Sequence, residues 1–116
     1  MQPREIRPVV LRALRIIYTG FHGELSLDAV ASELGVTEAY LSRTFKACMN
    51  CNFIDYVTQL KMSEAKILLL YEHEGITDIA SRIGYGDPKY FARVFKREVG
   101  VTPTQFRKQY KRPGQP

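Results

Sequence analysis

The chain has 116 residues, of which 45% are hydrophobic and 25% are charged, and its formal net charge at pH 7 is +5. This composition is typical of a globular protein and excludes a disordered one, and no apolar run approaches the ~20 residues of a membrane span. The N-terminal stretch lacks the apolar segment of a secretory signal, and two cysteines make no disulfide framework. We therefore expect a cytoplasmic protein with no membrane partner.

The chain opens with a predicted helix that begins at Pro8 and lies ahead of Gly20. A second helix is predicted over residues 27–34, where apolar residues recur at i, i+3, i+4 and i+7. These residues are Leu27, Val30, Ala31 and Leu34. Ser26 is a suitable N-cap for this helix, and Gly35 can adopt the left-handed conformation that ends it.

A third helix is predicted after the turn at Gly35, with Thr37 as its N-cap and residues 38–49 as its body. It contains the segment "YLSRTFK", residues 40–46. An amphipathic helix, a tight glycine turn and a second helix make a helix-turn-helix. The second helix of such a unit can enter the major groove of DNA.

Residues 53 to about 71 contain neither Pro nor Gly, and their apolar residues fall mostly at helical spacing. They predict one long helix that connects two parts of the chain. Its ~19 residues, at a rise of ~1.5 Å each, span roughly 29 Å, which is comparable to the ~34 Å between successive major-groove faces on one side of B-DNA. This length would allow one chain to place two recognition helices in adjacent major grooves.

The pattern of the first half recurs after Gly75. The apolar residues at i, i+3, i+4 and i+7 are here Ile76, Ile79, Ala80 and Ile83. Gly84 can end this helix, Asp87 can cap the next one, and Pro88 suits its first position. The second helix of this pair is therefore predicted over about residues 88–99.

A last short helix is predicted to open at Thr102 and Pro103, and no segment shows the two-residue alternation of a β-strand. The predicted fold is all-α, with seven helices that form two helix-turn-helix units joined by a long central helix. The predicted divisions are residues 8–52 for the first helix and first unit, 53–72 for the linker helix, 73–112 for the second unit and last helix, and 113–116 for a frayed tail.

The two helix-turn-helix segments are copies of each other. Equivalent positions are 49 residues apart in the first helix of each pair and 50 apart in the second, so the second copy has one extra residue in its turn. In the second helix of each copy the identical pairs are Tyr40 and Tyr90, Arg43 and Arg93, Phe45 and Phe95, and Lys46 and Lys96. Because the caps and glycines are also in register, the repeat indicates a duplication rather than chance.

Each second helix separates an apolar face from a small or basic one. The outward face carries Ala39, Ser42, Arg43 and Lys46 in the first copy, and Lys89, Ala92, Arg93 and Lys96 in the second. Small side chains let a helix approach base edges, and an arginine can donate two hydrogen bonds to guanine O6 and N7. The pattern therefore favours DNA contact over a merely solvated face.

Positive charge is concentrated near the C-terminus. Between residues 89 and 112 the only acid is Glu98. The bases are Lys89, Arg93, Lys96, Arg97, Arg107, Lys108, Lys111 and Arg112. Such a segment can hold a polyanion, of which nucleic acid is the commonest, although charge alone does not distinguish this role from a solvated helix face.

Two segments carry a resemblance to a known family. Residues 76–108, "ITDIASRIGYGDPKYFARVFKREVGVTPTQFRK", closely resemble the C-terminal signature of AraC/XylS transcriptional regulators, and residues 25–46, "LSLDAVASELGVTEAYLSRTFK", resemble their first helix-turn-helix. The resemblance covers about residues 9–110 and implies a bacterial, sequence-specific regulator. Residues 52–69, "NFIDYVTQLKMSEAKILL", look most like members that form the C-terminal part of two-component response regulators.

The resemblance also implies which residues contact DNA. In the family, base contacts come from the exposed face of each recognition helix. Carried over by position, these are Ala39, Ser42 and Arg43 in the first unit, and Pro88, Lys89, Ala92 and Arg93 in the second. The phosphate contacts implied in the same way are Thr37, Lys46, Lys96 and Arg97.

The stretch Cys48-Met49-Asn50-Cys51 raises the alternatives of a metal clip, a redox pair or a turn. The repeat aligns it with residues 98–101, where Asn50 replaces Gly100 at a position that favours a left-handed residue. A zinc site lacks further ligands at finger spacing, and a thioredoxin-like role lacks its βαβ context. We therefore interpret the stretch as a turn, with Cys51 packing as a small hydrophobic residue, and expect no metal or cofactor.

No motif for a phosphate-binding loop, a zinc protease or a nucleophile elbow occurs, so no catalytic residues are predicted. The expected partner is double-stranded promoter DNA, bound by a monomeric chain, because the duplication already supplies two readers. The alternative is a basic protein-docking module that contacts RNA polymerase or another acidic partner. With no evident sensing domain, the sequence fits either the output part of a longer regulator or a small stand-alone member.

Overall fold

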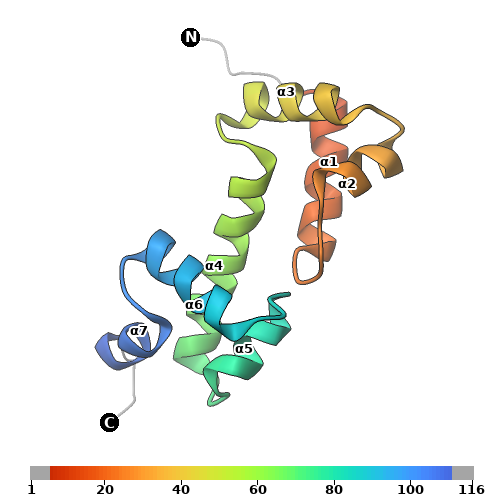
Figure 1. Ribbon diagram of the computed structural model, residues 1–116. Helices are drawn as coiled ribbons and strands as arrows, with labels where there is room; N and C mark the ends of the chain where they lie inside the picture. The colour runs from red at the N-terminus through yellow and green to blue at the C-terminus, as the bar shows by residue number, and fades with distance from the viewer. Residues whose placement is uncertain (1–5, 111–116) are drawn as a thin grey trace. The chain divides into compact units, whose positions relative to one another are not determined.

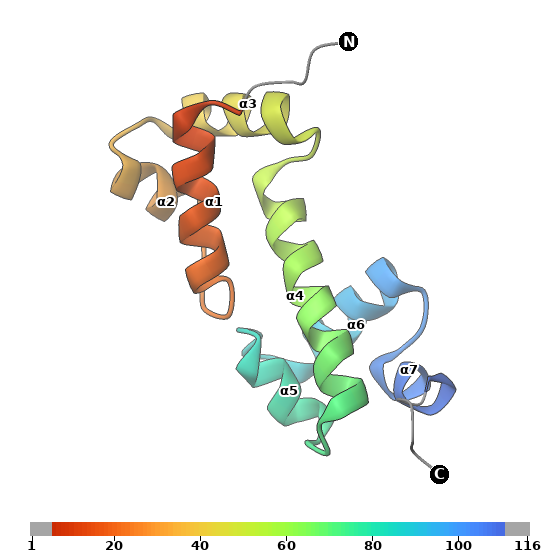
Figure 2. The ribbon, with the colours of Figure 1, turned by 180° about the vertical axis from the view of Figure 1, so that it is seen from behind.

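The structure, a computed structural model, describes residues 6–110, and within this range the chain forms seven α-helices and no β-strand (Figures 1 and 2). The helices are α1 (Pro8–Gly20), α2 (Leu27–Leu34), α3 (Glu38–Met49), α4 (Phe53–Tyr71), α5 (Ile76–Arg82), α6 (Pro88–Val99) and α7 (Pro103–Gln109). The predicted all-α, seven-helix fold is confirmed. Of the predicted features, Lys111, Arg112 and the tail over 113–116 lie outside the described residues.

The chain divides into two compact units, and the boundary between them follows Thr58, inside α4. The first unit contains α1, α2, α3 and the first residues of α4. The second contains the rest of α4, with α5, α6 and α7 around it (Figures 1 and 2). The long helix predicted from the absence of Pro and Gly is thus a single element of 19 residues that contributes to both units.

The first unit is built around apolar residues from all four of its helices. The fully or nearly buried side chains are Val10, Ala13, Ile17, Val30, Ala31, Leu34, Leu41, Phe45, Phe53 and Val57. Phe45 is central, because its ring lies 5.7 Å from that of Phe53 and 5.6 Å from that of Tyr56, both edge to face. Such aromatic pairs add to the free energy gained by burial and fix the orientation of α3 on the start of α4.

The second unit has an equivalent core around the C-terminal part of α4. Its buried residues are Met62, Ala65, Leu68, Leu69, Ile79, Ala80, Ile83, Phe91, Val94, Phe95 and Phe106. Phe95 occupies the repeat position of Phe45 and packs on Phe106 of α7 with a ring separation of 5.6 Å. The two units therefore anchor their second helices through the same aromatic position but with different partners.

The turns between the paired helices have the same hydrogen bonds in both units. After α2, Gly35 has φ 72° and donates to the Ser32 carbonyl, while Val36 donates to the Ala31 carbonyl. After α5, Gly84 has φ 92° and donates to the Ser81 carbonyl, while Tyr85 donates to the Ala80 carbonyl. Each of these residues lies 49 positions after its equivalent in the first unit. Both are Schellman motifs, in which a left-handed residue satisfies carbonyls at the helix end. The predicted left-handed glycines are confirmed.

Capping residues also occupy the predicted positions. Ser26 Oγ accepts the Ala29 N–H, Thr37 Oγ1 accepts the Tyr40 N–H, and an Asp87 carboxylate oxygen accepts the Lys89 N–H. At α7, Thr102 and Gln105 form a reciprocal capping box, with each side chain accepting the backbone N–H of the other residue. Gly75 occupies the N-cap position of α5 and makes no side-chain bond. The caps with side-chain bonds each satisfy a backbone donor that the helix itself leaves unpaired.

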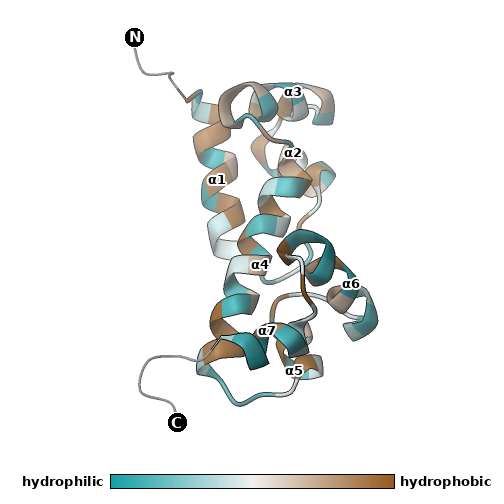
Figure 3. Ribbon diagram, turned by 90° about the vertical axis from the view of Figure 1, so that its left-hand side faces the viewer, coloured by the Kyte–Doolittle hydropathy of each residue, from teal (hydrophilic) through white to brown (hydrophobic). Residues whose placement is uncertain are grey.

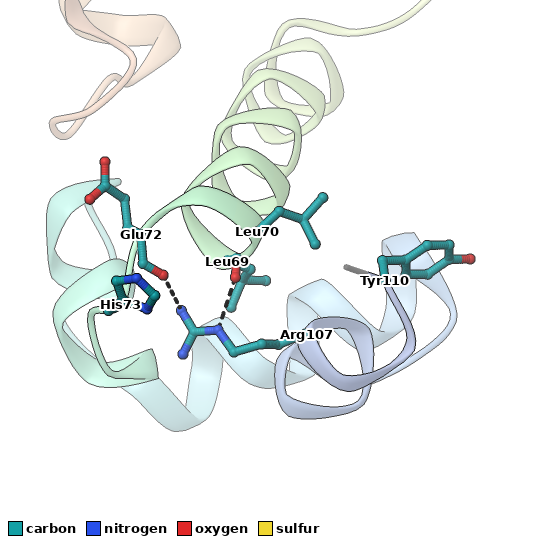
Figure 4. A pocket seen from close by; sticks show the side chains of 6 residues that line it. All are labelled: Leu69, Leu70, Glu72, His73, Arg107 and Tyr110. Carbon is teal, nitrogen blue, oxygen red and sulfur yellow. Dashed lines mark hydrogen bonds between the residues drawn. The ribbon is translucent and has the colours of Figure 1, made fainter. Parts of the chain in front are cut away.

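Arg107 of α7 connects the last helix to the end of α4. Its Nε donates to the Leu69 carbonyl at 2.9 Å and its Nη2 donates to the Glu72 carbonyl at 3.3 Å (Figure 4). These carbonyls belong to the last turn of α4 and the residue after it, where helical acceptors lack intrahelical partners. A hollow of about 140 Å³ adjoins this contact and is also lined by Leu70, His73 and Tyr110. Arg107 therefore acts as a C-terminal cap supplied from a distant part of the chain.

Tyr18 of α1 and Tyr56 of α4 share a hydrogen bond of 2.5 Å between their hydroxyl oxygens. Burial, followed by this bond, raises the pKa of Tyr56 to about 12. The folded protein therefore retains the Tyr56 proton at pH values at which an unfolded tyrosine, with a pKa near 10.0, has lost it.

Replacing Gly35 with Ala is expected to lower the free energy of unfolding by about 1–2 kcal/mol, because an L side chain in the left-handed region carries roughly that cost. The added Cβ would meet no atom within 4 Å, so the effect isolates backbone conformation. Gly86→Ala is the matched control, since its Cβ also meets open space and its φ is not left-handed. Urea unfolding measures both variants, and equal losses would contradict the assignment.

Arg107→Ala is expected to reduce the free energy of unfolding by about 1–2 kcal/mol, because two helix-end carbonyls lose a charged donor. Arg107→Lys should recover only part of this loss, since an ammonium group lacks the two-pronged geometry of a guanidinium. The neighbouring exposed residue provides the control, Lys108→Ala, which should leave urea unfolding nearly unchanged. A loss as large in Lys108→Ala would show that charge, rather than the cap, is responsible.

The stability contributed by Tyr56 is expected to be constant below pH ~10 and to be lost as the pH rises from about 10 towards about 12, because only the unfolded state ionises in that window. Comparing the pH dependence of urea unfolding for the wild type and Tyr56→Phe isolates this contribution from that of the lysines. A Tyr56→Phe protein with the same slope as the wild type in this window would contradict the raised pKa.

Candidate nucleic-acid interface

The first candidate surface lies on α3, whose orientation is set by its buried face. Leu41, Thr44 and Phe45 are buried against the core of the first unit. The opposite face carries exposed Ala39, Arg43 and Lys46, with Ser42 half-buried at its centre. The exposed Thr37 precedes the helix, and its Oγ1 accepts the Tyr40 N–H, which leaves the hydroxyl proton available to a further acceptor.

The second candidate surface lies on α6 and repeats this geometry 50 residues later. Phe91, Val94 and Phe95 are buried. The opposite face carries exposed Lys89, Arg93 and Lys96, with Ala92 half-buried at the position of Ser42. Pro88 is half-buried at the first helical position, and Arg97 is exposed. Both helices are amphipathic in the same phase, and their polar and apolar residues are seen in Figure 3.

The structure thus gathers each set of predicted residues on one face of its own helix. Within each stripe the basic side chains are exposed and the central residue is small, so a groove wall could approach the helix backbone there. Arg97 differs from the others because its Nε lies 3.2 Å from Glu98 Oε1 in an ion pair. Both side chains are substantially exposed, and an exposed pair of this kind is weak enough for a phosphate to replace it.

Sequence patterns did not identify Arg7 as part of either surface. Arg7 occupies the N-cap position of α1, and it lines a hollow of about 300 Å³ beside α3 together with Tyr40, Arg43, Thr44, Ala47 and Cys48. The hollow places a second guanidinium-bearing residue next to the outward face of α3. Contacts between distant segments leave no periodic signal in a sequence. Only the presence of basic residues before Pro8 could have suggested that Arg7 lies beside α3.

The two tyrosines that begin the recognition segments differ in their surroundings. Tyr90 is 46% exposed, its ring lies 5.9 Å from that of Tyr85, and the Arg93 Cζ lies 5.7 Å from the Tyr90 ring centroid. Tyr85 packs in turn on buried Phe91, and burial raises the pKa of Tyr85. Tyr40 is half-buried and lines the hollow beside α3. Each ring therefore lies at the edge of its core, with part of its surface exposed.

The cysteine stretch forms the turn after α3. Asn50 has φ 60° and donates its backbone N–H to the Lys46 carbonyl, just as Gly100, with φ 99°, donates to the Lys96 carbonyl. The prediction of a turn with a left-handed Asn50 is confirmed. Cys48 and Cys51 are both half-buried and free. In the described range, residues 6–110, no group of three or more His, Cys, Asp or Glu side chains is arranged to hold a metal ion.

None of the helices in residues 6–110 combines the length and the apolar character needed to cross a bilayer. The two repeated units, each presenting an exposed basic face on its second helix, are the architecture of a DNA-binding protein of the helix-turn-helix class.

Comparisons with known proteins agree with this class. A family model described as a helix-turn-helix domain matches residues 30–109. An uncharacterised helix-turn-helix transcriptional regulator from Pseudoalteromonas carrageenovora is 30% identical over 102 residues, which are 88% of this chain and 60% of that protein. The chain therefore spans less than two thirds of this relative.

Two solved structures are similar over nearly the whole chain. The C-terminal domain of AraT, a response regulator from Geobacillus stearothermophilus, is 35% identical with a TM-score of 0.92 and covers 97% of this chain and 94% of its own. An AraC-type DNA-binding domain protein from Chromobacterium violaceum is 25% identical with a TM-score of 0.80, covering 92% and 96%. The chain belongs to the AraC/XylS family of helix-turn-helix transcriptional regulators, which bind specific DNA sequences and are not enzymes.

Proposed function

We propose that α3 and α6 are the two recognition helices and that their outward stripes read bases in the major groove of double-stranded DNA. The proposed base-contacting residues are Ala39, Ser42 and Arg43 on α3, and Pro88, Lys89, Ala92 and Arg93 on α6. The observation that carries this proposal is the matched outward phase of the two helices, in which a half-buried small residue lies beside an exposed arginine in both units.

Within each stripe the side chains have different tasks. Arg43 and Arg93 donate two hydrogen bonds each to guanine O6 and N7, the commonest specific contact in the major groove. Ser42 and Ala92 are small enough for the helix backbone to lie close to the base edges. The proline ring of Pro88 offers apolar contact to a thymine methyl group, while Lys89 donates to acceptors on guanine.

Phosphate contacts hold the helices in register on the duplex. We assign them to Thr37, through its free hydroxyl proton, and to Lys46, Lys96 and Arg97 through their charge. Arg97 would exchange Glu98 for a phosphate on binding. These contacts release counterions and carry no sequence information, so they govern the salt dependence of affinity rather than the choice of site.

The length of α4 supports a site with two boxes. Its 19 residues correspond to about 29 Å, close to the ~34 Å between successive major-groove faces of B-DNA. We therefore propose that one monomeric chain reads two boxes about one helical turn apart, without the two-fold symmetry that a dimeric reader imposes on its operator.

The setting we propose is the output end of a longer bacterial regulator that acts on promoters in the cytoplasm. The similarity to the C-terminal domain of AraT supports a two-component response regulator in particular. In such a protein the DNA-reading helices described above would be controlled by a separate receiver, and transcription would change with the occupancy of the promoter.

Selection from a random DNA library is expected to enrich a two-box motif with the wild-type chain, and Arg43→Ala and Arg93→Ala are each expected to relax a different box. The lost discrimination should be about 1–3 kcal/mol at one base position, the usual value of a bidentate arginine–guanine contact. Lys46→Ala is the control, because a lost phosphate contact should weaken all sequences alike and reduce the salt slope by about 1.

A folded protein that enriches no motif would overturn the proposed function. Binding of RNA polymerase by the same exposed stripes, with no dependence on DNA sequence, would then support the docking alternative. Relaxation of the same box by both arginine variants would leave DNA reading in place but contradict the assignment of one box to each unit.

A further inference from the structure

We propose that Tyr90 is a positioning residue for Arg93, and that it makes the second unit the more stringent reader of its box. This inference rests on the proposed role of Arg93 in base recognition. Tyr90 and Arg93 lie about one helical turn apart on α6 and are in contact. The Arg93 Cζ lies 5.7 Å from the centroid of the Tyr90 ring, within the ~6 Å over which a guanidinium is attracted to an aromatic face.

The Tyr90 ring is itself supported from the core. Tyr85, in the turn before α6, lies 5.9 Å from Tyr90 and 5.5 Å from buried Phe91, measured between ring centroids. The Lys61 ammonium of α4 lies 5.0 Å from the Tyr85 centroid. A continuous series of contacts thus runs from the buried Phe91 through Tyr85 and Tyr90 to the exposed guanidinium, and it restrains a side chain that would otherwise sample many rotamers.

The first unit contains the same pair of residue types without this support. Tyr40 and Arg43 have the same spacing on α3, but the residue that corresponds to Tyr85 is Val36, which has no ring. A cation–ring contact joins Arg93 to Tyr90 in the second unit, whereas within residues 6–110 no such contact joins Arg43 to Tyr40 and no other ring packs on Tyr40. The difference coincides with the turn in which the second copy carries its extra residue.

Pre-orientation matters because an arginine must give up rotamer freedom to donate two hydrogen bonds in one plane. A guanidinium already held over a ring loses less freedom when it meets guanine, and it is less able to adapt to another base. The effect should therefore appear in discrimination between bases more than in affinity for DNA as a whole. An exposed cation–ring contact of ordinary strength corresponds to about a 2- to 5-fold change in an equilibrium constant.

The test measures the affinity of each variant for the selected two-box site. It then measures the affinity for the same site in which the guanine that Arg93 is proposed to contact has been replaced by another base. Tyr90→Leu is expected to reduce the ratio of the two affinities by about 2- to 5-fold, whereas Tyr90→Phe, which keeps the ring face, should retain it. Tyr40→Leu is the matched control, and it should leave discrimination at the guanine of Arg43 unchanged. Tyr85→Val, which copies the first unit, should act in the same direction as Tyr90→Leu.

A double-mutant cycle separates positioning from other roles. In an Arg93→Ala background, Tyr90→Leu should have no further effect on discrimination. An effect that persists there, or a Tyr90→Leu variant that loses affinity equally for all sequences, would overturn the proposal and indicate a direct DNA contact or a structural role. If Arg93→Ala itself leaves base preference unchanged, the base-reading role of Arg93 fails, and the positioning role fails with it. Loss of the ring-current shift of the Arg93 side-chain protons in Tyr90→Leu, by NMR without DNA, checks the contact independently.

Discussion

The left-handed turn between the paired helices is the constraint on which the rest of each unit depends. At Gly35 and Gly84 the chain leaves one helix, and the backbone N–H groups of the glycine and of the residue after it donate to carbonyls at the end of that helix. The first helix is thereby ended within two residues, and the next helix begins shortly afterwards. Thr37 and Asp87 then fix where it begins, and the buried Phe45 and Phe95 fix its rotation about its own axis. With start and rotation both set, the outward stripe follows without any contribution from the residues that form it.

Much of this could be predicted from sequence because each signal is local. Periodic apolar residues, caps and glycines lie within a few positions of what they control, and they gave the number and order of the helices. Even Asn50, which departs from the glycine of the second copy, was accessible through the repeat and adopts φ 60°. The end of α5 differs slightly: the helix ends at Arg82, and Ile83 at the C-cap position is fully buried and still donates its backbone N–H to the Ile79 carbonyl.

What the sequence could not predict are contacts between segments far apart in the chain. The bond from Arg107 to the Leu69 carbonyl and the bond between Tyr18 and Tyr56 each join residues 38 positions apart, and polar groups of this kind follow no helical period. The same holds at the candidate interface. Helical phase indicated that Arg43 and Arg93 face outward, but not that Arg7 would lie beside α3, nor that Tyr85 would support the ring next to Arg93.

The separation of buried and outward faces on α3 and α6 has a consequence for how such a protein can change. The residues that hold each helix in place are not those of the stripe, so substitutions at Ala39, Arg43, Lys89 or Arg93 leave the core packing intact. If each stripe reads its own box, as proposed above, a lineage can drift towards new operator sequences one box at a time, while the other box keeps the protein on its existing promoter. Duplication inside a single chain would then provide a tolerance to mutation that symmetric dimers, in which every substitution alters both half-sites, do not have.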